Sequence, residues 1–236
     1  MTEPTDSATS PPITREDIRA LRDRALADDR PADWFDPLYL AADGNSDQIP
    51  WALEGAHPAL KSWISERSLT DIFQIPHAKA LVVGCGLGDD AEALAQNGFQ
   101  VTAFDVSPCA VGWCQERFER SPVNYCVANL LELDPNWYGR FDLVFECRTI
   151  QALPLSVRDR AIDAVVAPVA PGGRLVVVTH TRPTEAIPDG PPWPLSPVEL
   201  DRFTQHHPLA LTWERKFTSP EMPPRRCLEF MRVRPS

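Results

Sequence analysis

Three glycines and one aspartate are the residues whose spacing most clearly suggests ligand chemistry. Gly84, Gly86 and Gly88 occupy alternate positions of one short segment, with Cys85 between the first two. Glycine has no Cβ, so such a turn lets bare backbone approach a ligand closely. Asp105 ends the next apolar segment, where a carboxylate can accept hydrogen bonds from the hydroxyls of a ribose. These residues predict a site for a nucleotide-type cofactor.

The segments around these residues predict the elements that must hold them. Residues 80–83 are an apolar run suited to a strand buried on both faces of a parallel sheet. Residues 89–98 favour a helix, with acidic side chains in the first turn and a glycine at the carboxyl end. Residues 99–104 favour a second strand that leads to Asp105. We therefore expect strand, glycine turn, helix, strand and acid to form one unit.

The residues after the third glycine distinguish two cofactor classes. A dinucleotide fingerprint reads G-x-G-x-x-G, whereas this chain has G-x-G-x-G followed by Asp89 and Asp90. A helix N-terminus favours phosphate because it is positive, and two adjacent carboxylates remove much of that advantage. S-adenosylmethionine (SAM) has a ribose, an adenine and a positive sulfonium but no phosphate. The pattern favours SAM, and a NAD-type dinucleotide-binding oxidoreductase is the alternative.

The stretch resembles motif I and the following acid of the class I SAM-dependent methyltransferases. The resemblance runs from Ile49 to the C-terminus, and residues 49–58, 84–88 and 141–154 are similar to the thiopurine and thiol or halide methyltransferase-like group. It implies SAM-dependent methyl transfer to a small-molecule acceptor. A thiol, selenium or halide nucleophile is favoured, and oxygen or nitrogen of a small metabolite comes next.

Two positions depart from the pattern of these relatives. Their usual acid directly after the tryptophan that matches Trp51 is Ala52 here, and Glu54 is the candidate substitute. The acid that accepts a hydrogen bond from the adenine amino group in many relatives is Asn129 here. Its amide oxygen can accept the same bond, or the residue can simply form a turn. A methyltransferase-like SAM-binding module without turnover is therefore a further alternative.

The predicted binding residues fall into two sets. The cofactor set lies at the glycine turn, at predicted strand ends and at one upstream tryptophan: Gly84, Cys85, Gly86, Gly88, Asp105, Val106, Asn129, Leu130, Glu146 and Trp51. The substrate set lies around the same edge of the sheet: Trp34, Arg148, His180 and Trp193. No catalytic residue is assigned, because an anionic nucleophile such as a thiolate needs no dedicated base.

Four of these residues have a structural alternative. Glu146 could attract the sulfonium or the amino group of the cofactor, and Arg148 could hold an anionic substrate, or both could be solvated charges at a strand end. His180 could take a proton from a substrate near neutral pH, or form a structural hydrogen bond. Trp34 and the aromatic residues after it form either a lid over the cofactor or a contact that docks the N-terminal helix on the core.

The whole pattern predicts one α/β domain. We expect a Rossmann-like three-layer α/β/α sandwich with a seven-stranded, mostly parallel sheet, an antiparallel C-terminal hairpin and an N-terminal helical lid. Residues 1–12 are expected to be a disordered tail and 13–236 a single domain, with N-terminal helices and lid over 13–75 and the Rossmann-like core over 76–236. Helix starts are expected at the capping residues Thr14, Ser107, Ser156 and Ser196, and further strands at 123–128, 141–147, 174–178, 209–217 and 226–233.

Composition argues against several function classes. The 236 residues include 23 basic and 33 acidic side chains, for a formal net charge of −10, and no basic cluster could track a phosphate backbone. No run approaches the roughly 20 apolar residues that span a bilayer. The six cysteines have no C-x-x-C spacing, so we expect reduced thiols and no metal site. We expect a cytoplasmic protein with a small-molecule substrate, no nucleic-acid or membrane partner, and a monomeric or weakly dimeric state.

The glycine turn and Asp105 generate a first prediction. SAM and its demethylated product should bind with measurable heat and raise the melting temperature. A ligand at a hundredfold excess over its Kd stabilises a protein by about 2.7 kcal/mol. Calorimetry with NAD is the comparison, and tighter binding of NAD than of SAM would reverse the choice of cofactor. No thermal shift at saturating SAM would contradict the prediction.

Overall fold

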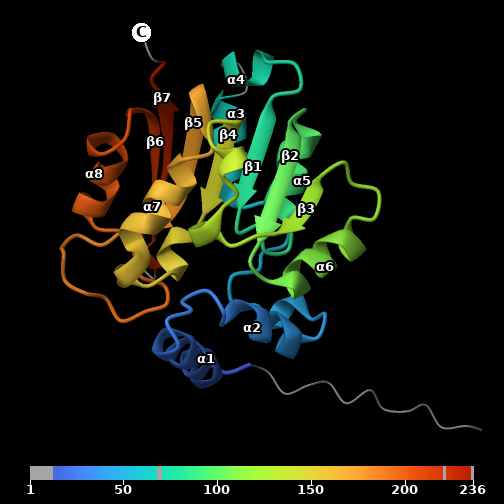
Figure 1. Cartoon of the computed structure of the whole chain (residues 1–236), viewed down its shortest axis with the longest axis vertical. Helices are drawn as coiled ribbons and strands as arrows, with labels where there is room; N and C mark the ends of the chain where they lie inside the picture. Colours follow the sequence, from blue (N-terminus) through green and yellow to red (C-terminus); the bar gives the residue numbers. More distant parts are fainter. Residues whose placement is uncertain (1–12, 68–70, 220–221, 235–236) are drawn as a thin grey trace, which may run out of the picture.

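One mixed sheet forms the centre of the protein. The computed structural model describes residues 13–67, 71–219 and 222–234 (Figure 1). Its strands are β1 (Lys79–Val83), β2 (Gln100–Asp105), β3 (Asn124–Val127), β4 (Phe141–Cys147), β5 (Val169–His180), β6 (Leu209–Ser219) and β7 (Met222–Arg232). They lie in the order β3-β2-β1-β4-β5-β7-β6, parallel from β3 to β5 and antiparallel in the two pairs that include β7. The predicted mostly parallel seven-stranded sheet with a C-terminal hairpin is confirmed. The tail expected at 1–12 lies outside the described residues.

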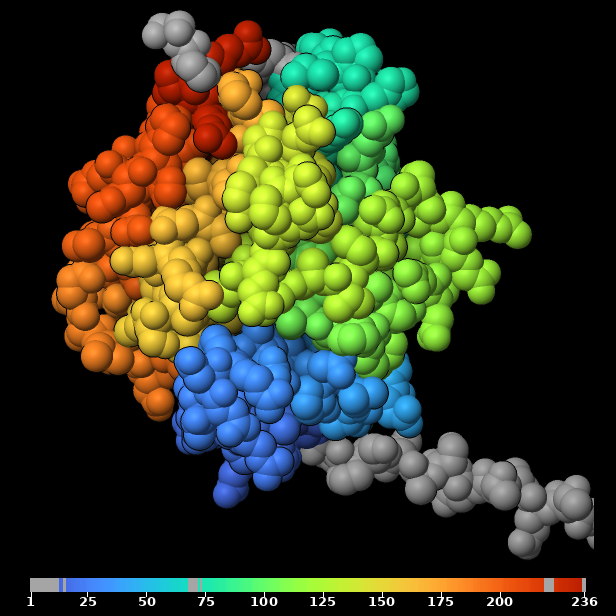
Figure 2. Space-filling view, in the orientation of Figure 1, coloured from blue at the N-terminus to red at the C-terminus, as the bar shows by residue number. Residues whose placement is uncertain are grey.

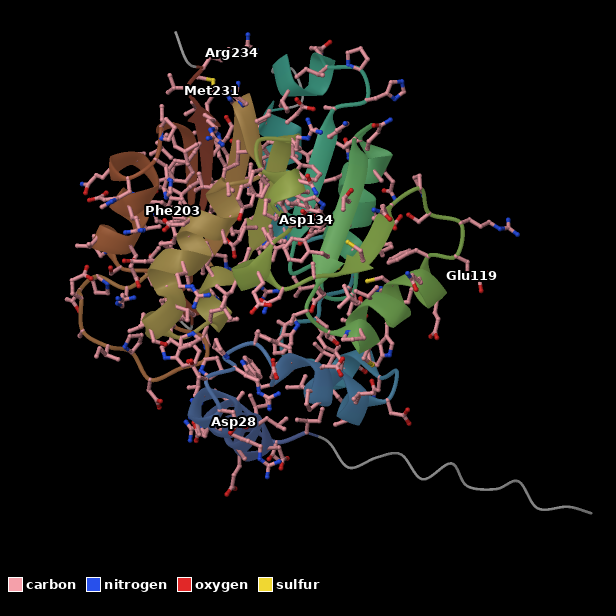
Figure 3. All side chains as sticks on the ribbon, in the orientation of Figure 1. Asp28, Glu119, Asp134, Phe203, Met231 and Arg234 are labelled. Carbon is pink, nitrogen blue, oxygen red and sulfur yellow. The ribbon has the colours of Figure 1, made fainter. Side chains whose placement is uncertain are left out.

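Helices cover both faces of the sheet. The α-helices of the described residues are α1 (Arg15–Ala27), α2 (Phe35–Ala42), α3 (Pro58–Arg67), α4 (Asp71–Gln74), α5 (Asp89–Gln96), α6 (Pro108–Arg117), α7 (Arg158–Val166) and α8 (Pro197–Gln205), of which α3 and α5 to α8 pack on the faces. One apolar cluster joins α7 and α8 to one face, where Phe203, labelled in Figure 3, stacks on Phe230 of β7 with ring centroids 5.1 Å apart. A second cluster joins α3, α5 and α6 to the other face. The result is the expected three-layer arrangement.

The N-terminal helices α1 and α2 form a separate layer at one edge of the sheet. In Figure 1 this blue segment lies below the arrowheads of β1 and β2, at the carboxyl ends of the parallel strands, and in Figure 2 its atoms pack directly against the green and yellow core. Trp34, Leu38 and Tyr39 are buried there in an apolar cluster that includes Leu87 and Ala110 from the core. The segment therefore covers the edge at which open α/β sheets bind ligands.

Helix caps were largely predictable from the sequence. Thr14 and Ser196 both form capping boxes, and Ser107 accepts a hydrogen bond from the first turn of α6. The start expected at Ser156 is wrong, because that residue lies in a 3-10 turn and α7 begins at Arg158 without a side-chain cap. The sequence marks a residue that can cap a helix, whereas tertiary packing decides whether it does.

The strand expected at 174–178 is longer than predicted. β5 already begins at Val169 and passes through residues 171–173, where the register with β4 shifts between Phe141 and Leu143. A Cβ at Gly173 would lie 3.0 Å from the backbone oxygens of both Phe141 and Asp142. The Pro-Gly-Gly sequence therefore forms an irregularity inside a strand, where neighbouring backbone comes too close for a side chain.

Gly88, which precedes α5, packs closely against β3 and α6. Gly88 has a φ of 88°, in the left-handed region. A Cβ there would lie 2.7 Å from the hydroxyl oxygen of Tyr125 on β3 and 3.0 Å from the Sγ of Cys114 on α6. Close packing of α5 against its neighbours therefore requires glycine at this position.

This packing generates a prediction about stability. Gly98→Ala is the matched control, because Gly98 has a φ of 91° but nothing within 4 Å of its added Cβ. The control should lose about 1–2 kcal/mol of unfolding free energy from backbone strain alone. Gly88→Ala should lose about 1–3 kcal/mol more, since overpacking adds to the strain. Urea denaturation measures both, and equal losses would contradict the packing role.

Candidate active site

A cavity of about 750 Å³ lies at the carboxyl ends of the parallel strands, beside the segment that contains α1 and α2. Its lining includes Gly84, Gly86, Asp105 and Val106 at the ends of β1 and β2; Asn129, Leu130, Cys147, Arg148, Gln151 and His180 at the ends of β3 to β5; Trp34, Phe35, Tyr39 and Trp51 from the N-terminal segment; and residues 189–192 of a loop before α8. Most of the residues predicted from the sequence therefore meet in one cavity.

Asp105 fixes the shape of the glycine turn. Its Oδ2 accepts a hydrogen bond from the backbone N–H of Gly86 at 2.9 Å, and its Oδ1 accepts from the N–H of Ser107 at 3.0 Å. Burial raises the pKa of Asp105, while these backbone bonds oppose the rise by stabilising the charged form. Each carboxylate oxygen can accept more than one hydrogen bond. The side chain can therefore hold the turn and still accept hydroxyl groups of a ribose.

The three glycines of the turn have different reasons to lack a side chain. A Cβ at Gly84 would collide with Oγ1 of Thr149, and one at Gly86 would lie 3.3 Å from the hydroxyl oxygen of Tyr39. Both glycines also line the cavity. Gly88 and the buried Cys85 are not part of the described lining. Of the three glycines expected to approach a ligand, Gly84 and Gly86 lie at the cavity, whereas Gly88 packs against neighbouring elements.

Aromatic side chains form the N-terminal wall of the cavity. Trp34 stacks on Phe35 with centroids 4.0 Å apart, and Trp51 packs edge-on against both Trp34 and Tyr39 at 6.0 Å. The indole N–H of Trp51 donates to the hydroxyl of Tyr39 at 2.9 Å. Trp34 is buried as well as cavity-lining. The cluster therefore docks α2 on the core and also covers the cavity. The docking contact and the lid, which the sequence offered as alternatives, involve the same residues.

Asp36 is a positioning residue that sequence reasoning missed. Its Oδ1 accepts hydrogen bonds from the Ser107 hydroxyl at 2.6 Å and from the Cys109 backbone N–H at 3.1 Å. These bonds fix α2 to the N-terminus of α6, where a carboxylate is favoured. The partners lie 71 and 73 residues away in the chain, so no local pattern indicates the contact.

Glu146 has a different place from the one expected. It is fully buried, its Oε1 accepts from the backbone N–H of Ile150 at 2.9 Å, and it is not among the described residues that line the cavity. Burial raises the pKa of Glu146 to about 7. The carboxyl group therefore shapes the 3-10 turn after β4 instead of extending toward a cofactor.

Arg148 connects β4 to the aromatic wall. Its φ of 66° is in the left-handed region, which is strained for a residue with a Cβ. Its Nη2 donates to the backbone oxygen of Trp51 at 2.8 Å. This bond fixes the tryptophan segment to the end of β4, and both residues line the cavity.

His180 lies at the cavity, at the end of β5. The residue is buried, and its Nδ1 lies 3.0 Å from Nε2 of Gln151. Burial and the nearby positive charges of Arg225 and Arg148 lower the pKa of His180 to about 4. The imidazole is therefore neutral at physiological pH.

Trp193, unlike His180, is not among the described residues that line the cavity. It is buried outside the described lining. Its backbone N–H donates to the backbone oxygen of Gln151 at 2.7 Å. The loop before Trp193 lines the cavity in its place, through residues 189–192.

Asn129 forms a turn and also lines the cavity. Its Oδ1 accepts from the backbone N–H of Leu131 at 3.0 Å, which is the turn-forming role. Asn129 also lines the cavity beside Leu130, and the amide oxygen has a second lone pair. Glu54, the candidate substitute for the acid missing after Trp51, is exposed and outside the described lining.

The two aspartates after the glycine turn bind other parts of the protein. Asp89 forms an ion pair with Arg117 at 2.9 Å, and Asp90 accepts from the backbone N–H of His57 at 2.7 Å. Burial raises the pKa of Asp90 to about 6. Neither is among the described cavity residues. Their charge therefore gives less reason to exclude a pyrophosphate than the sequence suggested.

Two contacts join α1 to the proline-rich loop at the cavity. Arg22 donates to the backbone oxygen of Gly190, and Arg19 lies 3.6 Å from the carboxylate of Asp189. Arg19, Asp189 and Gly190 also line the cavity. Two segments that lie 168 residues apart in the chain thus meet at the same cavity.

The described ranges contain neither a metal cluster nor a membrane span. In these ranges no group of three or more His, Cys, Asp or Glu residues could hold a metal ion. The six cysteines are free thiols. No helix between residues 13 and 234, within the parts described, has the length and apolar character needed to cross a membrane.

Comparisons with known proteins give consistent results. The family model for thiopurine S-methyltransferase (TPMT) matches residues 44–215. Among curated proteins, "Probable thiol methyltransferase 2" of Arabidopsis thaliana is 28% identical over 155 residues, which cover 65% of each chain. A thiopurine S-methyltransferase of Xanthomonas campestris pv. campestris is 29% identical over 143 residues, which cover 54% of this chain and 65% of that one. The matches thus span just under two thirds of these relatives.

A solved structure shows the same fold. The N-methyltransferase NodS from Bradyrhizobium japonicum, in complex with S-adenosyl-L-homocysteine, is similar with a TM-score of 0.62 and 20% identity. The similarity covers 82% of this chain and 96% of that one. It supports the Rossmann-like arrangement of sheet and helices.

The two roles of Asp105 generate a prediction. Asp105→Asn removes the charge and turns an NH₂ group toward one of the two backbone N–H donors, so it should weaken cofactor binding about 10- to 100-fold and lower the melting temperature, though less than Asp105→Ala. Asp105→Ala should lower both affinity and melting temperature. Asp142→Asn is the matched control, since Asp142 accepts from the Lys79 backbone N–H at 2.8 Å outside the described cavity lining. Calorimetry measures the affinities, and unchanged affinity in folded Asp105→Asn would refute the ribose role.

Proposed function

Because the chain belongs to the thiopurine S-methyltransferase family, we propose that it transfers the methyl group of SAM to a small-molecule nucleophile. One observation carries the proposal. A single cavity of about 750 Å³ brings the glycine turn and Asp105 together with Arg148, His180 and an aromatic wall. That volume is within the usual range for small-molecule sites.

The residues at the strand ends fit the parts of SAM. Asp105 has acceptor capacity for the ribose hydroxyls, and the backbone of Gly84 and Gly86 is open to the amino-acid tail. Asn129 and Leu130 offer a polar and an apolar contact for the adenine. SAM supplies a sulfonium methyl group that a nucleophile can attack in line.

The protein contributes mainly alignment and exclusion of water. The stacked Trp34 and Phe35, with Trp51 packed edge-on, form a wall of rigid apolar surface. Holding two reactants in line can contribute roughly 7–11 kcal/mol to lowering the barrier. This function needs a closed, well-packed cavity more than it needs a proton-transferring side chain.

The polar groups in the cavity favour an acceptor that arrives as an anion. Asp105 and Asp189 are the only carboxylates among the described lining residues, and Asp105 is used by the glycine turn. Arg148 and Arg19, which pairs with Asp189, are the positively charged side chains of the same lining, whereas His180 is neutral. A thiol with a pKa of about 8.5 ionises far more readily than an alcohol. We therefore place thiol, selenium and halide acceptors ahead of oxygen or nitrogen of a small metabolite.

The two other functions remain distinguishable. A NAD-type oxidoreductase is disfavoured by the family to which the chain belongs. A SAM-binding module without turnover is suggested by Ala52 and Asn129, the two departures from the relatives' pattern. Such a module would bind SAM with normal affinity and methylate nothing.

The acceptor class can be tested directly. The protein is incubated with methyl-labelled SAM and a panel of thiols, selenols, halides, phenols, amines, tRNA and protein. We expect label in the thiol, selenol or halide products, because these nucleophiles need no base. The Asp105→Ala variant is the control for cofactor-dependent labelling. Label that appears only in tRNA or protein would overturn the small-molecule proposal, and SAM binding without any labelling would favour the module.

A further inference from the structure

The order of the strands divides the cavity into two halves. The sheet runs β3-β2-β1-β4-β5 below it. Gly84, Asp105 and Asn129, which fit the parts of SAM, lie at the ends of β1, β2 and β3. On the other side of β1, the cavity is lined by Gln151 in the turn after β4 and by His180 at the end of β5. The half beside β4 and β5 is therefore the half left for the acceptor, and we call it the acceptor half.

The proline-rich loop before α8 covers the acceptor half. The backbone N–H of Trp193 donates to the backbone oxygen of Gln151 at 2.7 Å, and that of Leu195 donates to the backbone oxygen of His180 at 2.9 Å. Residues 189–192, directly before these two bonds, line the cavity. The loop is thus attached through its backbone to the same two residues that define the acceptor half.

Helix α1 closes the same half from the N-terminal side. The capping box of Thr14 and Asp17 fixes where this helix begins. Ile18 and Arg22 then lie about one turn apart on one face of the helix. Arg22 donates to the backbone oxygen of Gly190, and Ile18 lines the cavity. Figure 1 shows α1 on the side of the orange loop before α8, whereas α2 lies beneath α6.

This wall of the cavity is mostly apolar. Ile18 lines the cavity together with Leu153 and the prolines at 191–192. The ion pair of Arg19 with Asp189 is largely exposed, with 62% and 88% of the two side-chain surfaces open to solvent. Apolar contacts recognise the size of a ligand. Each buried methylene changes an affinity about fourfold, which corresponds to about 0.8 kcal/mol, and one that does not fit can change a preference about 10- to 200-fold.

The match to the family model does not include α1. It covers residues 44–215, whereas α1 ends at Ala27. Ile18 therefore lies before the part of the chain that matches the model, while the strand ends and the proline-rich loop lie within it. Membership of the family alone therefore does not determine how large an acceptor this protein takes.

Ile18 is held firmly enough to set a size limit. Its side chain is branched at Cβ, and such a side chain strongly prefers one rotamer in a helix. It packs against the apolar cluster that contains Trp34 and Tyr39. Arg22, whose side chain is only 13% exposed, fixes the next turn of the helix to the loop. A ligand that pushes Ile18 aside must therefore disturb contacts on both sides of α1.

Resting on the proposed function, we propose that Ile18 is a specificity-determining residue that sets the largest acceptor this protein methylates. An acceptor whose body fills the acceptor half gains apolar contact with Ile18. A longer acceptor meets α1 and must displace it. Ile18 has no part in the bonds that form and break, so it changes the order of preference among acceptors and leaves the chemistry of methyl transfer unchanged.

The size limit can be tested with linear thiols from ethanethiol to octanethiol. In the wild-type protein, kcat/KM should rise about fourfold per methylene until the limit is reached, and then fall. Ile18→Ala should raise the ratio of kcat/KM for octanethiol to that for ethanethiol about 10-fold, and Ile18→Trp should lower it about 10-fold. Opposite changes cannot come from a loss of stability, which both variants would share. Equal ratios in the three proteins, or changes in the same direction, would overturn the proposal.

Leu21→Ala is the matched control. Leu21 lies on the same helix and packs against the same apolar cluster as Ile18, but it is not among the described residues that line the cavity. Both alanine variants remove a similar apolar side chain, so thermal denaturation should show similar losses of stability. Leu21→Ala should keep the wild-type order of the thiols. If it changes that order as Ile18→Ala does, the effect comes from a loosened helix and the proposal is wrong.

The contact with Ile18 can also be tested without activity. Methyl spectra of isoleucine-labelled protein are recorded during titration with butyl methyl sulfide, the thioether that butanethiol would yield. The Ile18 methyl resonances, identified by their absence in Ile18→Ala, should shift. Ile75 is exposed and outside the described lining, so its resonances should stay in place. Ile18 resonances that do not move would overturn the proposal.

Failure of this proposal can be separated from failure of the proposed function. Calorimetry measures SAM binding in each variant, and we expect wild-type affinity in Ile18→Ala, because the residues that fit SAM lie in the other half of the cavity. A protein that binds no SAM contradicts the proposed function, while the sulfide titration still decides whether Ile18 contacts a ligand. A protein that methylates thiols in an order unaffected by the Ile18 variants contradicts only the size limit.

Discussion

The buried carboxylate of Asp105 is the interaction on which the site depends. It binds the backbone of Gly86 in the turn after β1 and that of Ser107 at the start of α6. The hydroxyl of Ser107 then donates to Asp36 of α2. Asp105 thus joins the glycine turn directly to α6, and through Ser107 to α2 beside the aromatic wall. Burying it is unfavourable, as the direction of its pKa shift shows, and the backbone N–H groups offset that cost.

Local patterns in the sequence predicted the parts of the fold that local physics decides. The apolar runs at β1 and β4 and the caps at Thr14 and Ser107 follow from residue type and spacing alone. The start of α7 and the irregularity in β5 did not follow, because they depend on packing against distant backbone. The sequence could indicate where elements begin only when the signal lies within a few residues.

In the candidate site, too, the features set by local sequence were predictable and those set by distant contacts were not. Gly86 and Asp105 belong to one compact motif, so their meeting was predictable from the sequence. The role of Gly88 depends on Tyr125, and the burial of Glu146 depends on the turn that it binds. Gln151 carried no signal at all, since its importance comes from a contact with His180 across 29 residues. Residues that position others are the least visible in a single sequence.

The contacts between α1 and the proline-rich loop have a consequence for the effect of salt on the protein. The pair of Arg19 and Asp189 is largely exposed, and such pairs contribute roughly 0–1 kcal/mol and weaken as salt screens them. This ion pair is therefore the salt-sensitive contact between the two segments, whereas the bond from Arg22 to the backbone oxygen of Gly190 is half-buried. Higher salt should therefore loosen the contact between α1 and this loop, while the aromatic wall behind it keeps its packing.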